Sequence, residues 1–210
     1  MNILTFGAHN DDYIIGAGGT LAKYAKDGKK FYSVIFSFGE QSHPIYQEKV
    51  TANFRVKESI KADKILGGSG VRYLGLKEGR FLDERDKAKK AIKKIIKEKK
   101  PEKIFTHSPN DPHFDHNAVY NIVTETLDDI KYKGDVYSFD VWNIINVKKQ
   151  DQPQLVVDIK DTFDQKIRSF KAHKSQKVAI WTLLWNVYLK AILNGRKHGY
   201  RYCEVFNKIR

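Results

Sequence analysis

Hydrophobic and polar positions alternate along this chain with two different periods. Short apolar, β-branched or aromatic runs predict strands at 3–6, 31–37, 71–76, 103–108, 135–142 and 154–159. Longer stretches with helical spacing lie between and after them, and they predict helices at 18–27, 46–66, 85–100, 116–131, 161–173 and 178–193. The alternation predicts an α/β fold: a Rossmann-like three-layer sandwich with a mostly parallel sheet of order 3-2-1-4-5 and helices on both faces.

The pattern runs through the 210 residues without an internal repeat, a low-complexity tract or a linker. We therefore predict one domain over 1–210, with the part from 150 to 210 as a strand–helix–helix appendage.

Charge adds a question about partners. Lys and Arg number 38 and Asp and Glu 25, a net charge of +13 that favours an acidic partner such as nucleic acid or an anionic surface. Much of the excess lies in 85–103, where five apolar residues at helical spacing form one stripe: Ala88, Ala91, Ile92, Ile95 and Ile96. A solvated lysine face is therefore the preferred interpretation, and no nucleic-acid partner is expected. The aromatic stretch 178–193 is interpreted as a largely buried helix, with an interfacial or oligomer contact left open.

Cysteine usage and apolar runs set the expected location. The single Cys203 excludes a disulfide framework and a Cys-rich zinc finger, so a reducing, cytoplasmic location is expected. The first residues do not follow the signal-peptide pattern, and no apolar run approaches the roughly 18 residues of a membrane span.

Polar side chains cluster after the first and the fourth predicted strand. His9-Asn10-Asp11-Asp12 follows the first, and the second cluster holds His107, Asp111, His113, Asp115 and His116. These two strands are neighbours in the predicted order, and ligands of such sheets bind beyond the carboxyl ends at this point. Each cluster alone has a structural explanation in turns and helix caps. Together they indicate a divalent metal site, because two histidines and one carboxylate hold Zn²⁺ and leave a position for water.

Glycines 16, 18 and 19 invite a nucleotide interpretation, which the sequence disfavours. Leu21 stands where a dinucleotide-binding loop needs its third glycine, and no P-loop motif occurs. We expect these glycines to let the start of a helix pack closely on the sheet.

Short motifs occur in order along nearly the whole chain. They are AHNDDY at 8–13, GAGGTLAKYAKDGK at 16–29, Arg55 with Glu58, YLGLKEG at 73–79, HFDHNAV at 113–119, KIRSFKAHKSQ at 166–176 and GYRYCEVF at 199–206. The ordered set resembles the PIG-L / LmbE-like family of zinc-dependent N-acetylglucosaminyl deacetylases.

This resemblance implies roles for seven residues. The zinc ligands would be His9, Asp12 and His116, and Asp11 would be the general base. His113 would stabilise the oxyanion or protonate the leaving amine, Asp115 would hold and polarise His113, and Arg55 would bind substrate hydroxyls. His173 and Gln176 match a family motif and are expected to be structural. Asn10 and Phe114 replace motif prolines. Tyr13 replaces a glutamate, and we expect this replacement to alter either the hydrogen bonding behind the ligands or the substrate rim.

The resulting hypothesis is a cytoplasmic metal-dependent hydrolase that removes an N-acetyl or other acyl group from a small molecule containing an amino sugar. The cofactor would be Zn²⁺, although the same donors accept Fe²⁺ or Co²⁺. Two alternatives stay open: a zinc amidase acting on a non-sugar amide, and a non-enzymatic basic Rossmann-like binding module. A homo-oligomer is also left open.

Overall fold

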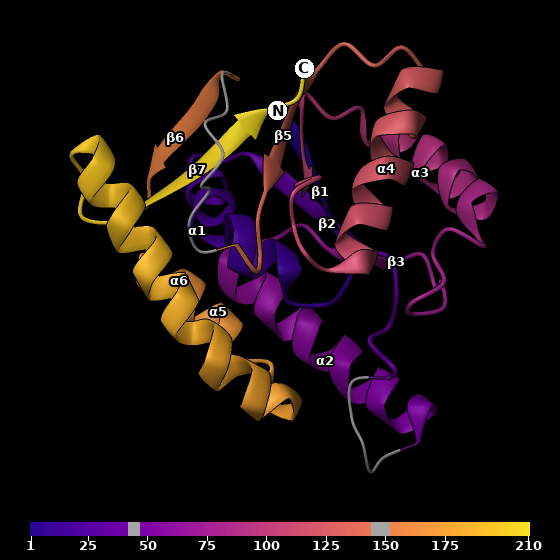
Figure 1. Cartoon of the computed structure of the whole chain (residues 1–210), viewed down its shortest axis with the longest axis horizontal. Helices are drawn as coiled ribbons and strands as arrows, with labels where there is room; N and C mark the ends of the chain where they lie inside the picture. Colours follow the sequence, from indigo (N-terminus) through magenta and orange to yellow (C-terminus); the bar gives the residue numbers. More distant parts are fainter. Residues whose placement is uncertain (42–46, 144–151) are drawn as a thin grey trace.

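A seven-stranded sheet forms the middle layer of the protein (Figure 1), whose computed structural model describes residues 1–41, 47–143 and 152–210. The strands are β1 (Asn2–Gly7), β2 (Lys30–Ile35), β3 (Val71–Tyr73), β4 (Lys103–His107), β5 (Asp135–Phe139), β6 (Gln154–Asp158) and β7 (Cys203–Lys208). Their order is β3-β2-β1-β4-β5-β7-β6. The first five are parallel, which confirms the predicted order of these strands, while β7 pairs antiparallel with both β5 and β6.

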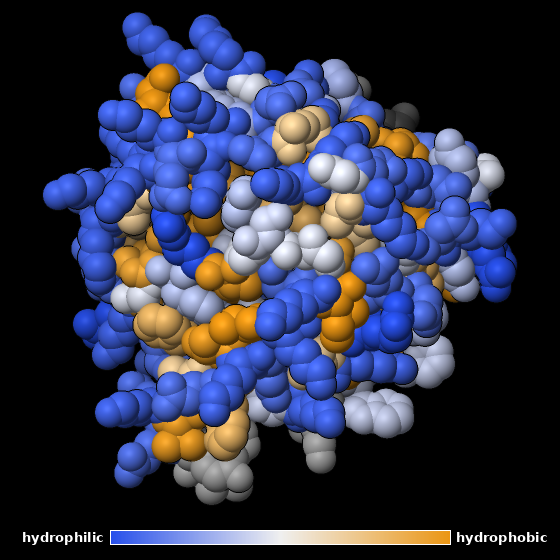
Figure 2. All heavy atoms as spheres, turned by 180° about the vertical axis from the view of Figure 1, so that it is seen from behind, coloured by the Kyte–Doolittle hydropathy of each residue, from blue (hydrophilic) through white to orange (hydrophobic). Residues whose placement is uncertain are grey.

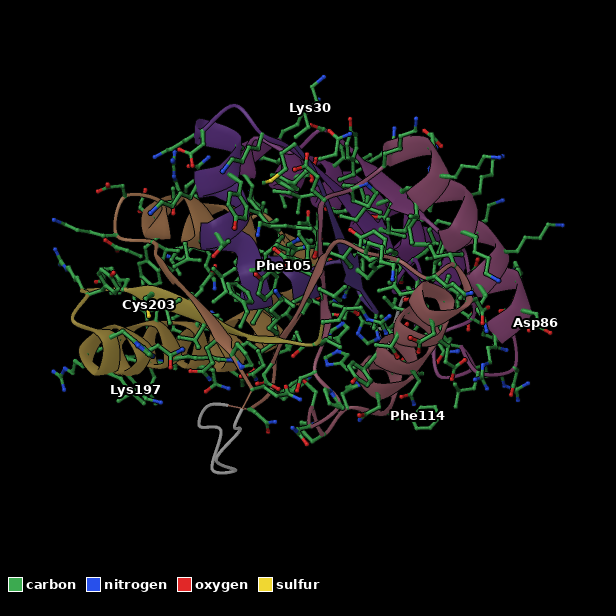
Figure 3. All side chains as sticks on the ribbon, turned by 90° about the horizontal axis from the view of Figure 1, so that it is seen from above. Lys30, Asp86, Phe105, Phe114, Lys197 and Cys203 are labelled. Carbon is green, nitrogen blue, oxygen red and sulfur yellow. The ribbon has the colours of Figure 1, made fainter. Side chains whose placement is uncertain are left out.

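Helices cover both faces of this sheet, as predicted. The elements are α1 (Asp12–Lys26), α2 (Glu48–Leu66), α3 (Arg85–Lys99), α4 (Phe114–Asp129), α5 (Phe163–Phe170), the short 3-10 helix η1 (Lys174–Gln176) and α6 (Lys177–His198). One apolar core lies beneath α1, α2, α5 and α6, and a second lies beneath α3 and α4. Phe105 of β4 lies near the middle of the molecule in Figure 3.

The lysine-rich helix α3 behaves as its pattern predicts. Ala88, Ile92, Ile95 and Ile96 are buried, whereas Ala91 is partly exposed. Lys89 and Lys93 form ion pairs with Asp129 of the neighbouring helix α4, at 3.0 and 2.7 Å. Hydrophilic side chains dominate the face shown in Figure 2, with apolar residues gathered in its middle.

Two boundaries correct the sequence analysis. Helix α1 begins at Asp12 rather than at 18, so its glycines lie inside the helix. The segment 150–210 is not only strand–helix–helix, because β7 follows α6 and separates β6 from β5. The expected first residue of the second helix, position 46, and residues 144–151 lie outside the described residues.

Close packing explains the glycines of α1. A Cβ atom on Gly19 would lie 2.8 Å from Ile159 Cδ1, and one on Gly16 would overlap the ring of Phe139. The backbone N–H groups of Gly19 and Thr20 donate to the buried Glu204 carboxylate at 3.0 and 2.7 Å. The interpretation of these glycines as packing residues is confirmed.

The substitution Gly19→Ala should therefore lower the free energy of unfolding by about 1–3 kcal/mol, because the added methyl group overpacks a filled contact. Urea denaturation followed by circular dichroism measures the change. The matched variant Lys61→Ala, at an exposed position of α2, should change the same quantity by less than about 0.5 kcal/mol. Equal effects of the two variants would contradict the close-packing argument.

Among the described residues, no helix is both long enough and apolar enough to cross a membrane.

Candidate metal centre

The two polar clusters meet because β1 and β4 are parallel neighbours. Residues 9–12 follow the carboxyl end of β1, and residues 111–116 follow that of β4. Asp11 is the N-cap residue of α1 and Asp12 its first residue, while His113 is the N-cap residue of α4. Two helix starts thus hold the functional side chains at one edge of the sheet, as the predicted topology requires.

A pocket open to solvent lies at this edge. Six of the seven predicted site residues line it: His9, Asp11, Asp12, Arg55, His113 and His116. The seventh, Asp115, is not among the lining residues. An apolar wall completes the pocket and is formed by Ile15, Val141, Trp142 and Leu183.

Three groups of side chains in the described part of the chain are able to hold a metal ion. They are His9 with Asp12 and His116, His107 with Asp111 and His116, and His9 with Glu78 and Asp115; in each, the ligand atoms lie within 4.8 Å of one another. Only in the first group do all three members line the pocket. A catalytic site needs access for water and substrate, so this group fits a catalytic ion best.

Outer carboxylates orient the two histidines of this group. His116 Nδ1 lies 2.9 Å from Asp111 Oδ1, and His116 Nε2 lies 3.4 Å from Asp12 Oδ1. His9 Nε2 lies 3.3 Å from Asp115 Oδ2 and 3.4 Å from Glu78 Oε1, and its Nδ1 lies 3.5 Å from Asp12 Oδ2. Each ring thus presents one nitrogen to a carboxylate and the other to the ligand group, as metal-binding histidines do.

Charge is concentrated around Asp12. Burial raises its pKa, but the histidines His116, His107 and His9 together hold the pKa well below its usual range. Burial lowers the pKa of His116, yet Asp12 and Asp111 raise it to about 9. Without a cation, this cluster attracts protons onto its histidines, and a divalent ion satisfies the same negative charge.

Asp11 lies on the pocket wall beside Arg55. Arg55 Nη2 lies 3.4 Å from Asp11 Oδ1, and the Arg55 side chain is buried. His173 is fully buried near this pair, and burial lowers its pKa to about 4. Arg55 therefore reaches the pocket from α2 and faces the carboxylate that the sequence analysis names as the base.

The carboxylate of Asp115 contacts a different histidine from the one expected. It lies against His9 and accepts the Gly79 backbone N–H at 3.2 Å. His113 Nδ1 instead accepts the Asp115 backbone N–H at 3.2 Å, because His113 caps α4. Asp115 thus fixes His113 through its backbone and His9 through its side chain.

Asp111 had no predicted role, and only its position in the second polar cluster pointed to it. Besides His116, its carboxylate accepts the backbone N–H of His113 at 3.2 Å and that of Val141 at 2.8 Å. One buried side chain therefore links a candidate metal ligand to the apolar wall of the pocket. His107 also lies behind the site: its Nε2 accepts the Ala8 backbone N–H at 3.1 Å and lies 3.1 Å from Asp12 Oδ2.

The substitution Asp111→Asn should weaken metal binding by about 10–100-fold. An amide has one acceptor oxygen, so either His116 or the Val141 backbone would face an NH₂ group, donor against donor. Zinc affinity is measured by competition with a chromogenic chelator. Asp86→Asn on the exposed start of α3 serves as the control and should keep wild-type affinity. Unchanged affinity of Asp111→Asn would contradict this role.

The three residues that depart from the motifs do not line the pocket. Tyr13 is fully buried away from the pocket lining, near Ser33 and Ser59. Tyr13 is therefore not part of the pocket rim, which was one of the two places where its effect was expected. Asn10 is buried and donates to the Phe38 carbonyl at 3.4 Å, whereas Phe114 is exposed and points away from the molecule (Figure 3).

Fold and site together define a class: a Rossmann-like α/β protein with a His/Asp cluster able to bind a divalent metal at the switch point of its sheet. Residues 4–127 match the family model described as PIG-L, GlcNAc-PI de-N-acetylase. The chain belongs to this family.

Known relatives agree with this assignment. A 1D-myo-inositol 2-acetamido-2-deoxy-alpha-D-glucopyranoside deacetylase of Rhodococcus jostii is 28% identical over 60% of this chain, which spans about half (53%) of that protein. The diacetylchitobiose deacetylase of Thermococcus kodakarensis is 25% identical, over 96% of this chain and 80% of its own. Among solved structures, the 4-carboxy-2-hydroxymuconate hydratase GalB of Pseudomonas putida shares the fold, with a TM-score of 0.85, 20% identity, and coverage of 100% of this chain and 96% of its own.

Proposed function

We propose that this protein is a metal-dependent N-deacetylase that releases acetate from a small N-acetylated amino-sugar compound. The observation that carries the proposal is the joint position of five side chains on one pocket: the group His9, Asp12 and His116, with Asp11 and His113 beside it. The deacetylase relatives support the choice of an acetylated amino sugar as substrate.

The donor set fits Zn²⁺, which prefers imidazole nitrogen and carboxylate oxygen. When bound, zinc would supply Lewis acidity, lowering the pKa of a water molecule toward about 7 and polarising the acyl carbonyl group. Asp12 would hold the ion together with His9 Nδ1 and His116 Nε2, the ring nitrogens that face Asp12. Asp111 and Asp115 would keep those two rings in the required orientation.

Asp11 would take a proton from the attacking water. Its carboxylate lines the pocket next to a proposed ligand, and Arg55 restrains it on the far side. The proton would then pass to the amide nitrogen as the C–N bond breaks, giving the free amine and acetate. A base placed in this way contributes about 10²–10⁴-fold to the rate.

His113 would stabilise the oxyanion. Its Nδ1 accepts the Asp115 backbone N–H, so the neutral ring carries its proton on Nε2 and donates from there. Burial, followed by the charge of His116, lowers the pKa of His113, which favours this neutral form. A hydrogen bond from a preorganised donor strengthens as negative charge develops on the carbonyl oxygen.

The remaining pocket walls would select the substrate. Arg55 supplies a buried cation toward the sugar hydroxyls, and Ile15, Val141 and Leu183 supply an apolar surface for the acyl methyl group. We also propose that residues 1–210 act as one domain, since β7 pairs with β5 of the parallel sheet and α5 packs on α1 and α2.

An acetate-release assay tests this function. The protein is incubated with a panel of N-acetylated amino-sugar conjugates, with and without a chelator, and acetate is measured. We expect release from at least one conjugate, lost with chelator and restored by added Zn²⁺. Hydration of an unsaturated tricarboxylic acid, without acetate release from any conjugate or simple amide, would contradict the proposal. So would acetate release that is indifferent to chelator.

A further inference from the structure

An apolar stripe lies exposed on the outer face of α6. We call Trp181, Trp185, Leu189 and Leu193 the α6 stripe; their exposed fractions are 72, 74, 45 and 37%. Successive members are four residues apart, so each step turns the helix by about 40° and the four share one face. The stripe runs about 18 Å along the helix axis, at 1.5 Å per residue.

The inner face of the same helix is apolar as well. Ile180, Leu183, Val187 and Ala191 are buried in the core beneath α6. A helix that is apolar on both faces normally has both faces covered. Yet α6 lies at the outer edge of the molecule (Figure 1), so its stripe faces solvent. Scattered apolar residues on a surface need no explanation, but two tryptophans exposed on adjacent turns of one face indicate a contact site.

The segment of the chain that carries the α6 stripe has charge of one sign. Residues 165–201 hold nine Lys and Arg residues and no Asp or Glu. Exposed cations lie at both ends of the stripe: Lys171 and Lys174 before it, and Arg196 and Lys197 after it. Figure 3 shows Lys197 on α6, far from Phe114 on the opposite helical layer. The partner of this face therefore offers apolar surface together with negative charge.

We propose that the α6 stripe docks the protein on the surface of an anionic lipid bilayer, with α6 lying in the plane of the membrane. Tryptophan partitions into the interface between headgroups and acyl chains, and Lys and Arg beside it bind acidic headgroups. A second copy of the same face fits less well, because residues 165–201 supply no carboxylate to meet the cations. The helix rests on the bilayer and does not cross it, in line with the absence of a spanning helix among the described residues.

Docking would also position the catalytic pocket. Leu183 of α6 lines that pocket, and it stands between Trp181 and Trp185 in the chain. The pocket wall and the α6 stripe thus belong to the same turns of one helix. This inference goes beyond the proposed deacetylase function and does not depend on it, since membrane binding is measured without substrate or metal.

Vesicle co-sedimentation tests the docking face on the full chain. One set of vesicles contains phosphatidylcholine alone, and the other contains phosphatidylcholine and phosphatidylglycerol in a two-to-one ratio. We expect binding to the anionic set, weakened by added salt, and a blue shift of tryptophan fluorescence on binding. Trp181→Ala/Trp185→Ala should lower the partition coefficient at least about tenfold. Arg196→Gln/Lys197→Gln should lower it about 25-fold, at roughly fivefold per charge.

Two matched variants serve as controls. Phe114→Ala removes an exposed aromatic side chain from α4, and Lys94→Gln/Lys97→Gln removes two exposed cations from α3. Both should bind anionic vesicles as the wild type does. Circular dichroism and the thermal midpoint verify that the α6 variants fold, which is expected because the substituted side chains are exposed.

Three outcomes would overturn the proposal. One is the absence of binding to anionic vesicles. Another is equal loss of binding in the α6 variants and in their α3 and α4 controls, which would indicate a general effect of charge. The last combines two results: the wild type does not bind vesicles, and light scattering shows a wild-type dimer that Trp181→Ala/Trp185→Ala dissociates. That combination would assign the stripe to a second copy of this chain.

Discussion

Asp11→Ala should abolish nearly all turnover while leaving zinc bound. Asp11 lines the pocket beside the proposed ligands but is not one of the three, so its loss removes the proton acceptor and keeps the metal group. The expected fall in kcat is about 10²–10⁴-fold, the usual contribution of a general base. Steady-state kinetics with the best substrate of the conjugate panel, combined with metal analysis after dialysis, measures both quantities on one sample.

Two further variants sharpen this test. Asp11→Asn keeps the shape of the side chain and an acceptor for Arg55 at 3.4 Å, so a loss as large as that of Asp11→Ala would point to the missing base and not to a displaced arginine. Asp164→Asn, at a highly exposed position of α5, should match the wild type. Wild-type kcat in Asp11→Ala would exclude Asp11 as the base.

His116→Ala should remove the metal itself. His116 supplies one of only three proposed ligands and is buried, so neither water nor a neighbouring surface residue replaces its nitrogen. We expect zinc content to fall from about one ion per chain toward zero after dialysis, and acetate release to disappear with it. The rise in thermal midpoint that zinc gives the wild type should also vanish, because a ligand stabilises only a fold that binds it.

A paired variant separates the candidate metal groups. His107 belongs to a second group with Asp111 and His116, but it does not line the pocket. His107→Ala should therefore retain zinc at close to one ion per chain, even if the fold loses some stability. The reverse pattern, with zinc lost from His107→Ala and kept in His116→Ala, would contradict the proposed ligand set.

The spacing of apolar residues was sufficient to predict the parallel part of the fold. Strands β1 to β5 lie within the short runs rich in apolar residues, and a helix follows each of the first four. Strand β7 escaped prediction because its buried residues include Glu204 and Asn207, whose polarity hides a strand in the sequence. Glu204 is stabilised there by Lys166 at 2.7 Å and by the N–H groups of α1, contacts that only the folded chain supplies.

The site followed from the sequence in a similar way. The positions of His9, Asp12 and His116 at the ends of neighbouring strands predicted their meeting. The carboxylates that contact the histidine rings could not be predicted from the sequence, because the direction of each side chain depends on how the local helix begins. The capping of α4 by His113 turns that ring toward the Asp115 backbone and leaves the Asp115 carboxylate to His9. Nor did the sequence indicate that Tyr13 points into the core.

The place of β7 also sets an order for folding. Strand β6 pairs with β7 alone among the described strands, although it precedes β7 in the chain by about 50 residues. A ribosome therefore releases β6 well before its partner exists, so this edge of the sheet closes after the parallel part. During that interval the apolar positions of β6 and α6 are exposed together. This edge of the sheet therefore depends on fast completion of the chain or on a chaperone.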